Sequence, residues 1–268
     1  MRLNGMVLES DNSPLRTVPV FVLTVEAPDQ PRRRHAAAEL ERLGIEAQFV
    51  EGYGTADAHI DSLYSPLRNL LMSKRSLSRG EIAVYAGHRA VWQRLIESGA
   101  EVALVLEDDF KITDDEALKA VMRDSIPCTD QWDVVKLFDF RPKRIVLRKI
   151  FGSTNVVAYK YPASGAVAYL ITRNAALKLL RRPRIYRPVD EDISHMWEFG
   201  IRVWSVCPNV AAEHSEALGG SKIDEGRSAR TETRRMGRSL WGNVLQAVKL
   251  ARSLAYRRRL GQPGSGRS

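Results

Sequence analysis

Five apolar residues at positions 102–106 end directly in three acids, Glu107, Asp108 and Asp109. Five residues are too few for a helix, and a run without a polar position is typical of a strand covered on both faces. Such strands lie inside open α/β sheets, where ligands bind beyond the carboxyl ends of the strands. The sequence therefore predicts a central strand that delivers three carboxylates to a ligand-binding edge.

Strand-like and helix-like segments alternate through the first two thirds of the chain. Ser78 and Glu81 have the spacing of a capping box and predict that a helix begins there. The other helices are predicted at 32–43, 172–180 and 189–199, and the other strands at 18–25, 47–50, 132–138, 156–160, 166–171 and 201–206. This alternation predicts one open, mostly parallel α/β sheet with helices on both faces. We expect a leader at 1–17, the domain at 18–225 and a tail at 226–268.

The net charge of +9 is concentrated at the C-terminal end of the chain. Residues 226–268 contain eleven Lys or Arg and one acid, Glu232, which leaves thirty basic and thirty-one acidic residues in positions 1–225. A near-neutral domain with a basic tail argues against a nucleic-acid groove and indicates contact with an anionic surface.

The tail also has the pattern of a modestly amphipathic helix. Its apolar positions share one side of that helix, and they are Leu240, Trp241, Val244, Val248, Ala251 and Ala255. Arg238, Lys249 and Arg252 lie away from that side. We expect the tail to bind an anionic membrane surface. The alternative is a solvated terminal helix that packs weakly on the domain.

The cysteine content and the lack of a long apolar segment indicate the cellular compartment of the protein. Two widely separated cysteines, Cys128 and Cys207, give neither a disulfide framework nor a zinc knuckle and favour a reducing compartment. The short apolar run at 18–25 does not match a secretion signal, and no segment reaches the roughly 20 apolar residues of a spanning helix. The sequence predicts a cytoplasmic protein, with peripheral contact at the inner face of the membrane.

The three acids require a partner of opposite charge. On a regular strand, Glu107 and Asp109 would lie about 6.5–7 Å apart on one side and repel by roughly 2.5 kcal/mol at an effective dielectric of 20. Mn²⁺ or Mg²⁺ would turn this repulsion into attraction and could bridge to nucleotide phosphates. The alternative is a solvated acidic turn before the next helix.

Several motifs together resemble glycosyltransferase family 25, the family of lipopolysaccharide and collagen galactosyltransferases. Leu77 to Glu81, His88 and Trp92 are followed by the strand that ends in Glu107, Asp108 and Asp109. Further segments also resemble the family, and they are Ala163 to Tyr169 with Ala176, the Pro188-Val189-Asp190 triplet, and Ala217 to Gly219 with Ser221 and Ile223. The sequence departs from the pattern at Thr24, Ala83 and Gly87, where the family has Asn, Gly and Ser.

The resemblance implies a GT-A-like fold and a metal-dependent, inverting transfer of a hexose from a UDP-sugar, usually UDP-galactose, to a saccharide or lipid-linked saccharide acceptor. Asp109 and Asp108 would hold the metal. His214 is a further candidate ligand that the family resemblance does not fix, because it lies beyond the last predicted strand, where GT-A enzymes often supply a late metal ligand. The expected donor-binding residues are Thr24, Arg33, Arg34, His88, Glu107, Asp108 and Ser221. For His88 the alternative is a hydrogen-bonded core histidine, and for the cluster Arg32 to Arg34 it is a solvated helix start.

Inverting transfer also needs a base that takes the proton of the acceptor hydroxyl. Asp190 is the first candidate, and Glu191 and Asp192 could share or replace its role. The alternative for Asp190 is a helix cap. Two rival functions stay open, namely a catalytically inactive glycan- or nucleotide-binding relative and a metal-dependent nucleotidyl or phosphoryl transferase.

Overall fold

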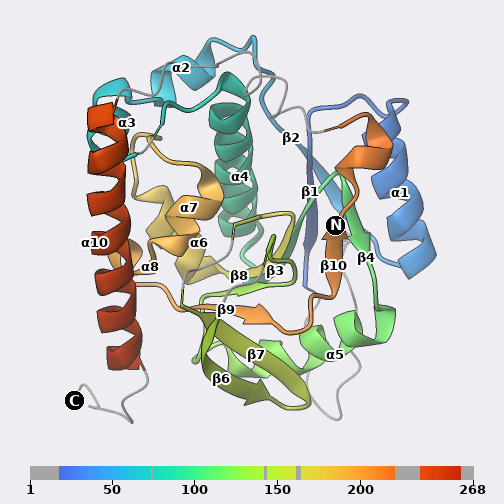
Figure 1. Ribbon diagram of the computed structural model, residues 1–268. Coiled ribbons are helices and arrows are strands. Elements are labelled where there is room, and N and C mark those ends of the chain that lie inside the picture. The colour runs from blue at the N-terminus through green and yellow to red at the C-terminus, as the bar shows by residue number, and fades with distance from the viewer. Residues whose placement is uncertain (1–17, 74, 142–143, 161–163, 221–235, 261–268) are drawn as a thin grey trace.

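The computed structural model describes residues 18–73, 75–141, 144–160, 164–220 and 236–260 (Figure 1). The predicted leader, Ser221 and both ends of the tail lie outside these ranges. Within them, eight strands form one sheet in the order β2-β1-β3-β8-β5-β9-β7-β6. In chain order these are β1 (Val20–Thr24), β2 (Gln48–Glu51), β3 (Val102–Glu107), β5 (Val134–Lys136), β6 (Ile145–Phe151), β7 (Thr154–Tyr159), β8 (Ala168–Thr172) and β9 (Val203–Val206).

The sheet is mixed, and six of its eight strands run in one direction. β1 pairs in parallel with β2 and β3, and β5 pairs in parallel with β9. β8 is antiparallel to both β3 and β5, and β7 is antiparallel to both β9 and β6. Only β8 and β7 therefore point the other way among the described strands, which confirms the predicted open, mostly parallel α/β sheet. The carboxyl ends of β1, β3 and β5 meet at one edge.

Helices cover both faces of the sheet, as predicted, because its strands present apolar side chains to both sides. On β1, Phe21 and Leu23 belong to one buried cluster, and Val20 and Val22 belong to the other. The first cluster includes side chains of α4 (Arg79–Ser98), α6 (Arg173–Leu180), α7 (Val189–Ser194) and α8 (Met196–Phe199). The second includes side chains of α1 (Pro31–Leu43) and α5 (Asp115–Ser125).

The predicted start of α4 is confirmed. Ser78 Oγ accepts a hydrogen bond from the Glu81 N–H at 3.2 Å, and Glu81 Oε2 accepts one from the Ser78 N–H at 2.9 Å. Thr172 caps α6 in a similar way through the N–H of Ala175. These local signals place the two helices that pack on the central strands.

Two expectations need correction. The single helix predicted at 189–199 is two helices, because His195 leaves the helical conformation with φ −84° and ψ 45° between α7 and α8. The strand at 201–206 is not the last, because β10 (Ala211–Glu213) pairs with β4 (Phe110–Ile112) in a separate two-stranded sheet. This pairing brings the segment after β9 back to the carboxyl end of β3.

The remaining elements frame the candidate site. α2 (His59–Leu63) and α3 (Pro66–Met72) precede α4, and short 3₁₀ helices lie at Ile126–Cys128 and Ser215–Leu218. The long helix α10 (Met236–Leu260) stands beside α3 and α8 in Figure 1. Among the described helices, none combines the length and apolar character needed to cross a membrane.

Candidate functional site at the carboxyl end of β3

Glu107 is the last residue of β3, and Asp108 and Asp109 follow it directly, at the carboxyl end of a strand inside the sheet. Glu107 is held by its N–H, which donates to the Val167 carbonyl at 2.8 Å. Asp108 and Asp109 are 5% and 4% exposed. The alternative of a solvated acidic turn is therefore wrong for Asp108 and Asp109.

Arg32 of α1 forms ion pairs with both aspartates. Its Nη1 atom donates to Asp108 Oδ1 at 3.2 Å and to Asp109 Oδ2 at 3.0 Å, and its Nη2 donates to the Gly220 carbonyl at 2.7 Å. Thr24, at the end of β1, donates from Oγ1 to Asp108 Oδ2 at 2.6 Å. One arginine thus joins the acidic pair to the segment after β10.

The sequence carried a signal for Arg32 that the prediction of donor residues did not use. Positions 32, 36 and 40 share one face of a helix, and Ala36 and Leu40 are buried in α1 together with Arg32. Arg33 and Arg34 were predicted instead. Arg33 lies over the Phe49 ring at 4.6 Å and donates to the Glu26 carbonyl, whereas Arg34 is exposed.

The pKa values of both aspartates are raised even though Arg32 pairs with them. Burial and the neighbouring charge of Glu107 raise the pKa of Asp109 to about 7, although Arg32 opposes this shift. Burial also raises the pKa of Asp108. Among the described residues, Asp109 Oδ1 is buried and has no hydrogen-bond partner. This oxygen is the place where the pair still lacks a cation or a donor.

A divalent metal fits this arrangement only in a limited way. The described part of the chain contains no cluster of three or more His, Cys, Asp or Glu side chains that could hold an ion. Mg²⁺ often binds through one or two carboxylates and completes its shell with substrate phosphates and water. Asp109 Oδ1 suits that mode. His214 donates its backbone N–H to the Asp109 carbonyl at 2.8 Å, but its ring stacks on His35.

His88 is fully buried below Glu107. Its Nε2 atom lies 3.1 Å from Glu107 Oε1, and its Nδ1 atom lies 2.9 Å from the Tyr169 hydroxyl. Trp92 Nε1 donates to the same hydroxyl at 3.0 Å. His88 is thus a hydrogen-bonded core histidine, as one alternative held, and through Glu107 it also supports the edge of the candidate site.

Asp190 lies beside this edge. Its Oδ2 accepts from the Gly165 N–H at 3.1 Å, and its Oδ1 accepts from the Glu191 N–H at 2.9 Å. Gly165 is two residues before Val167, whose carbonyl binds the N–H of Glu107. The first turn of α7 and the end of β3 are therefore linked through one short segment, and two backbone donors orient the Asp190 carboxylate.

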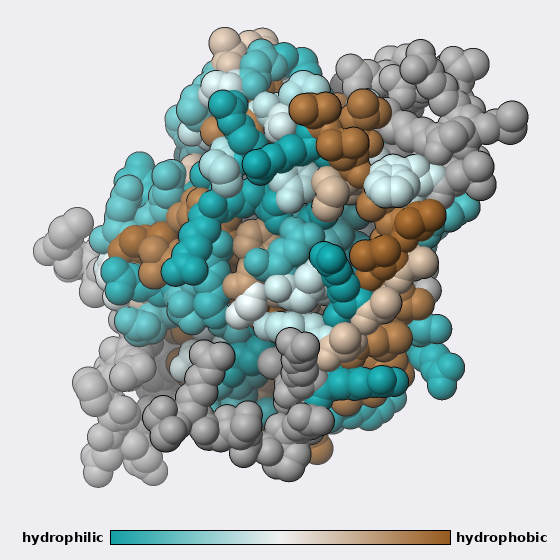
Figure 2. All heavy atoms as spheres, turned by 90° about the vertical axis from the view of Figure 1, so that its left-hand side faces the viewer, coloured by the Kyte–Doolittle hydropathy of each residue, from teal (hydrophilic) through white to brown (hydrophobic). Residues whose placement is uncertain are grey.

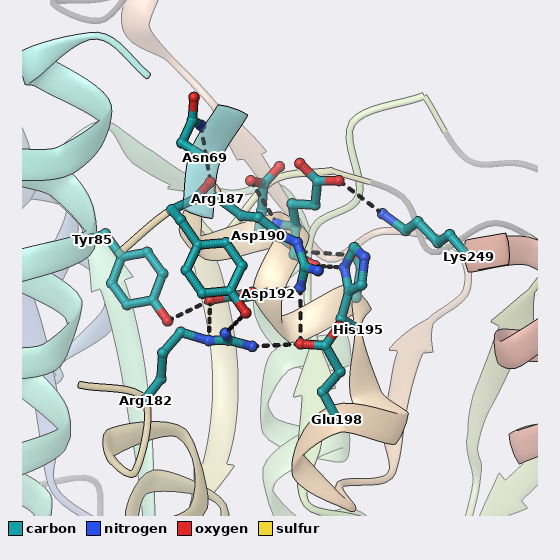
Figure 3. A network of polar contacts seen from close by, with 12 residues as sticks. Asn69, Tyr85, Arg182, Arg187, Asp190, Asp192, His195, Glu198 and Lys249 are labelled. Carbon is teal, nitrogen blue, oxygen red and sulfur yellow. Dashed lines mark hydrogen bonds and ion pairs between the residues drawn. The ribbon is translucent and has the colours of Figure 1, made fainter. Parts of the chain in front are cut away.

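The neighbours of Asp190 have different surroundings (Figure 3). Glu191 Oε1 lies 3.6 Å from Lys249 Nζ of α10. Asp192 is fully buried and paired with Arg182 at 2.8 Å and Arg187 at 3.3 Å, and it accepts from the Tyr85 hydroxyl at 2.8 Å. Asp192 has no access to an acceptor hydroxyl, so the expectation that it could share the role of base is corrected.

A further charged pair lies at the carboxyl end of β5 and was missed from the sequence. Lys136 Nζ is 2.5 Å from Asp139 Oδ1, and both side chains are buried. Lys136 Nζ also lies 3.4 Å from the Ser164 carbonyl, next to the Gly165 that binds Asp190. Their spacing of three residues carries no specific signal, because only the pairing of β5 with β8 brings them to the site.

Comparison with known proteins shows similarity to one family of glycosyltransferases. The model of glycosyltransferase family 25 (LPS biosynthesis protein) matches residues 18–193. The chain is 26% identical over 191 residues to inactive glycosyltransferase 25 family member 3 of Mus musculus, covering 67% of this chain and 32% of the relative. It is 30% identical over 132 residues to procollagen galactosyltransferase 1-B of Xenopus laevis, covering 46% and 21%.

The chain thus spans only a third or less of the length of these two relatives. Among solved structures it is similar to mannose-1-phosphate geranyltransferase from Thermus thermophilus, with a TM-score of 0.38 and 14% identity over 71% of this chain and 73% of that chain. A similarity at this level carries no argument about function.

Proposed function

The chain belongs to glycosyltransferase family 25, and from this premise we propose that it moves a hexose, with galactose the first candidate, from a UDP-sugar to a hydroxyl of a saccharide acceptor. The observation that supports the proposal is that one short segment connects the acidic pair to a third carboxylate. Asp108 and Asp109 follow the central strand directly, and Asp190 is linked to the end of that strand through Gly165 and Val167. Group transfer between a phosphate and an alcohol needs both a charged site for the leaving group and a base.

At the donor side, the leaving group is a nucleoside diphosphate that gains negative charge as the sugar–phosphate bond breaks. Arg32 supplies a buried guanidinium at this place, and Thr24 fixes the Asp108 carboxylate. Mn²⁺ or Mg²⁺, held by Asp109 and the diphosphate, would supply Lewis-acid stabilisation of the same charge. Both oxygens of Asp108 already accept hydrogen bonds, from Arg32 and Thr24, so Asp108 is less available to a metal than Asp109.

At the acceptor side, Asp190 is the proposed base. The acceptor oxygen attacks the anomeric carbon, the bond from that carbon to the diphosphate breaks, and the hydroxyl proton passes to Asp190. The N–H groups of Gly165 and Glu191 hold this carboxylate in one orientation. Glu191 is the weaker candidate, because it lies near the ammonium of Lys249.

The setting we propose is synthesis of lipopolysaccharide or another cell-surface glycan at the cytoplasmic face of the membrane. A lipid-linked saccharide would be the acceptor there, and the basic tail would hold the enzyme on the anionic surface. No role in binding nucleic acid is proposed, because the excess positive charge lies in the tail.

A second candidate is a catalytically inactive relative that still binds a glycan or nucleotide. The ion pairs between Arg32 and both aspartates favour it, because they occupy oxygens that a metal would use. The name of the mouse relative also contains the word inactive. The two candidates differ in turnover rather than in binding.

The deciding experiment is a screen of UDP-sugars with Mn²⁺ for release of UDP, with and without saccharide acceptors. Asp109→Asn and Asp190→Asn should greatly lower the acceptor-dependent release of UDP by the wild-type chain, while Glu116→Gln, on the exposed side of α5, should leave it unchanged. Saturable UDP binding without release from any donor would support the inactive relative. Full activity in Asp109→Asn, or in excess chelator, would refute the proposed metal role.

A further inference from the structure

Helix α10 turns its apolar side outward. The exposed side chains include Trp241, Val244, Val248, Ala251 and Ala255, which share one side of the helix. The side facing the body contains Lys249, Ser253 and Arg257, of which Ser253 and Arg257 are 1% and 5% exposed, together with the half-buried Leu245 and Tyr256. A helix that packs on a domain normally buries most of its apolar side chains. In α10 most of the apolar side is exposed instead, and in this sense the helix is inverted.

Helix α3 is inverted in the same manner. Its polar Asn69 is buried, with Nδ2 donating to the Tyr186 carbonyl at 3.0 Å, and Ser73 just beyond the helix is buried too. Its large apolar side chains are exposed, and they are Leu67 (68%), Leu70 (52%), Leu71 (52%) and Met72 (38%). Two helices far apart in sequence thus share one anomaly.

The two inverted helices form one continuous surface. Trp241 Nε1 donates to the Leu71 carbonyl at 2.7 Å, so the start of α10 is fixed to the end of α3. Figure 2 shows brown side chains gathered over α3 and along α10 on this face of the molecule. We call this set the α3–α10 surface, consisting of Leu67, Leu70, Leu71, Met72, Trp241, Val244 and Val248. A contiguous exposed apolar patch of this kind marks an interaction site.

The charge around the α3–α10 surface identifies its partner. Neither helix contains an acid, while Arg68, Arg252 and Arg258 are exposed on them. In a two-fold dimer the same patch would face itself and bring these like charges together. An anionic bilayer offers the opposite charge and an apolar interior, and tryptophan is favoured at the boundary between them.

We propose that the α3–α10 surface lies on an anionic lipid bilayer, with its leucines, valines and Trp241 inserted at the headgroup boundary and its arginines contacting the lipid phosphates. This goes beyond a basic tail acting alone, because α3 of the folded domain supplies half of the contact. Lys249, on the opposite side of α10, pairs with Glu191 beside Asp190. The bound orientation therefore sets the acceptor side of the site close to the membrane, a consequence that rests on the proposed function.

The test is cosedimentation of the full chain with vesicles of phosphatidylcholine and phosphatidylglycerol, compared with phosphatidylcholine alone. The wild-type chain should pellet with anionic vesicles and lose most of this binding in high salt. Leu67→Ser/Leu70→Ser and Val244→Ser/Val248→Ser should each lower the partition coefficient by about tenfold or more. Ile150→Ser and Leu177→Ser replace exposed apolar side chains outside the α3–α10 surface and should leave the partition coefficient unchanged.

The substituted side chains are exposed, so melting temperatures close to wild type would show that the variants fold. Equal vesicle binding by the α3 variant and the wild type would overturn the proposal. So would a concentration-dependent dimer that the α3 variant dissociates while vesicle binding persists, because the surface would then join two copies. Since vesicle binding needs no turnover, it can succeed or fail independently of the transferase activity.

Discussion

The Nη1 atom of Arg32 lies 3.0 Å from Oδ2 of Asp109 at the carboxyl end of the central strand. The same atom reaches Asp108, so a single guanidinium holds two buried carboxylates. Removing one partner of a buried ion pair leaves an uncompensated charge and costs about 3–5 kcal/mol. We expect Arg32→Gln to lower the free energy of unfolding by about this amount in urea denaturation.

Arg34 is the matched control, because it lies two residues further along α1 and is exposed. Arg34→Gln should change the free energy of unfolding by no more than about 0.5 kcal/mol. Equal stability of the two variants would show that Arg32 does not hold the acidic pair in solution.

The raised pKa of Asp109 predicts a dependence of stability on pH. Its pKa of about 7 in the folded protein lies above the ordinary value of 3.8, so the folded state binds this proton more tightly between pH 4 and 7. The free energy of unfolding should therefore fall as pH rises through this range, by at most about 1.4 kcal/mol per pH unit from this group.

Urea denaturation between pH 4.5 and 7.5 measures this slope. Asp109→Asn keeps the shape of the side chain and removes its titration, so the fall with pH should be smaller in the variant. Asp114→Asn is the control, because Asn also serves as a helix N-cap and Asp114 caps α5 away from the acidic pair. Parallel pH profiles for the wild type and Asp109→Asn would contradict the shift.

The part of the fold that could be predicted from the sequence is the part that local patterns determine. The apolar run before Glu107 predicted the central strand, and Ser78 with Glu81 predicted the start of α4. Asp190 was singled out by a short motif, and the structure places it beside the end of β3.

Features that depend on tertiary pairing could not be predicted in the same way. Helical spacing from Val189 to Phe199 gave no sign of the break at His195, whose ring lies 2.7 Å from the Glu191 carbonyl. The sequence pattern places the apolar positions of α10 on one side, but the burial of Ser253 and Arg257 and the ion pair between Lys249 and Glu191 are needed to show that this side faces outward. A pattern defines the sides of a helix without saying which one packs on the domain.

The surroundings of Asp190 and Glu191 predict different effects on turnover. A positioned base contributes about 10²–10⁴-fold to rate, so Asp190→Asn should lower kcat by that factor and leave KM for the donor within a few-fold. Glu191→Gln weakens the contact with Lys249 and should lower kcat by less than about tenfold. Initial rates with saturating donor and acceptor separate the two.

The reverse order, with Glu191→Gln inactive and Asp190→Asn active, would assign the base to Glu191. A similar fall in kcat in both variants would mean that Asp190 and Glu191 act together. Circular dichroism of each variant checks that α7 and its neighbours still fold.

The hydrogen bond with Tyr169 predicts which ring nitrogen of His88 carries the proton. That tautomer in turn decides whether His88 donates to Glu107. Trp92 Nε1 can only donate, so the Tyr169 oxygen accepts from it, and the Tyr169 hydroxyl in turn donates a hydrogen bond to His88 Nδ1. The remaining ring proton is then on Nε2 and is donated to Glu107 Oε1. Tyr169→Phe removes this constraint and should cost about 1–3 kcal/mol of stability, because two buried groups lose a partner.

The tautomer of His88 can be measured directly, and a mere loss of packing in Tyr169→Phe would not change it. Nitrogen chemical shifts of His88 should show a protonated Nε2 in the wild type and a mixture of tautomers in Tyr169→Phe. Tyr53→Phe is the control, because Tyr53 contacts His59 outside this chain of hydrogen bonds. A protonated Nδ1 in the wild type would contradict the proposed direction of the hydrogen bonds that lead from Tyr169 through His88 to Glu107.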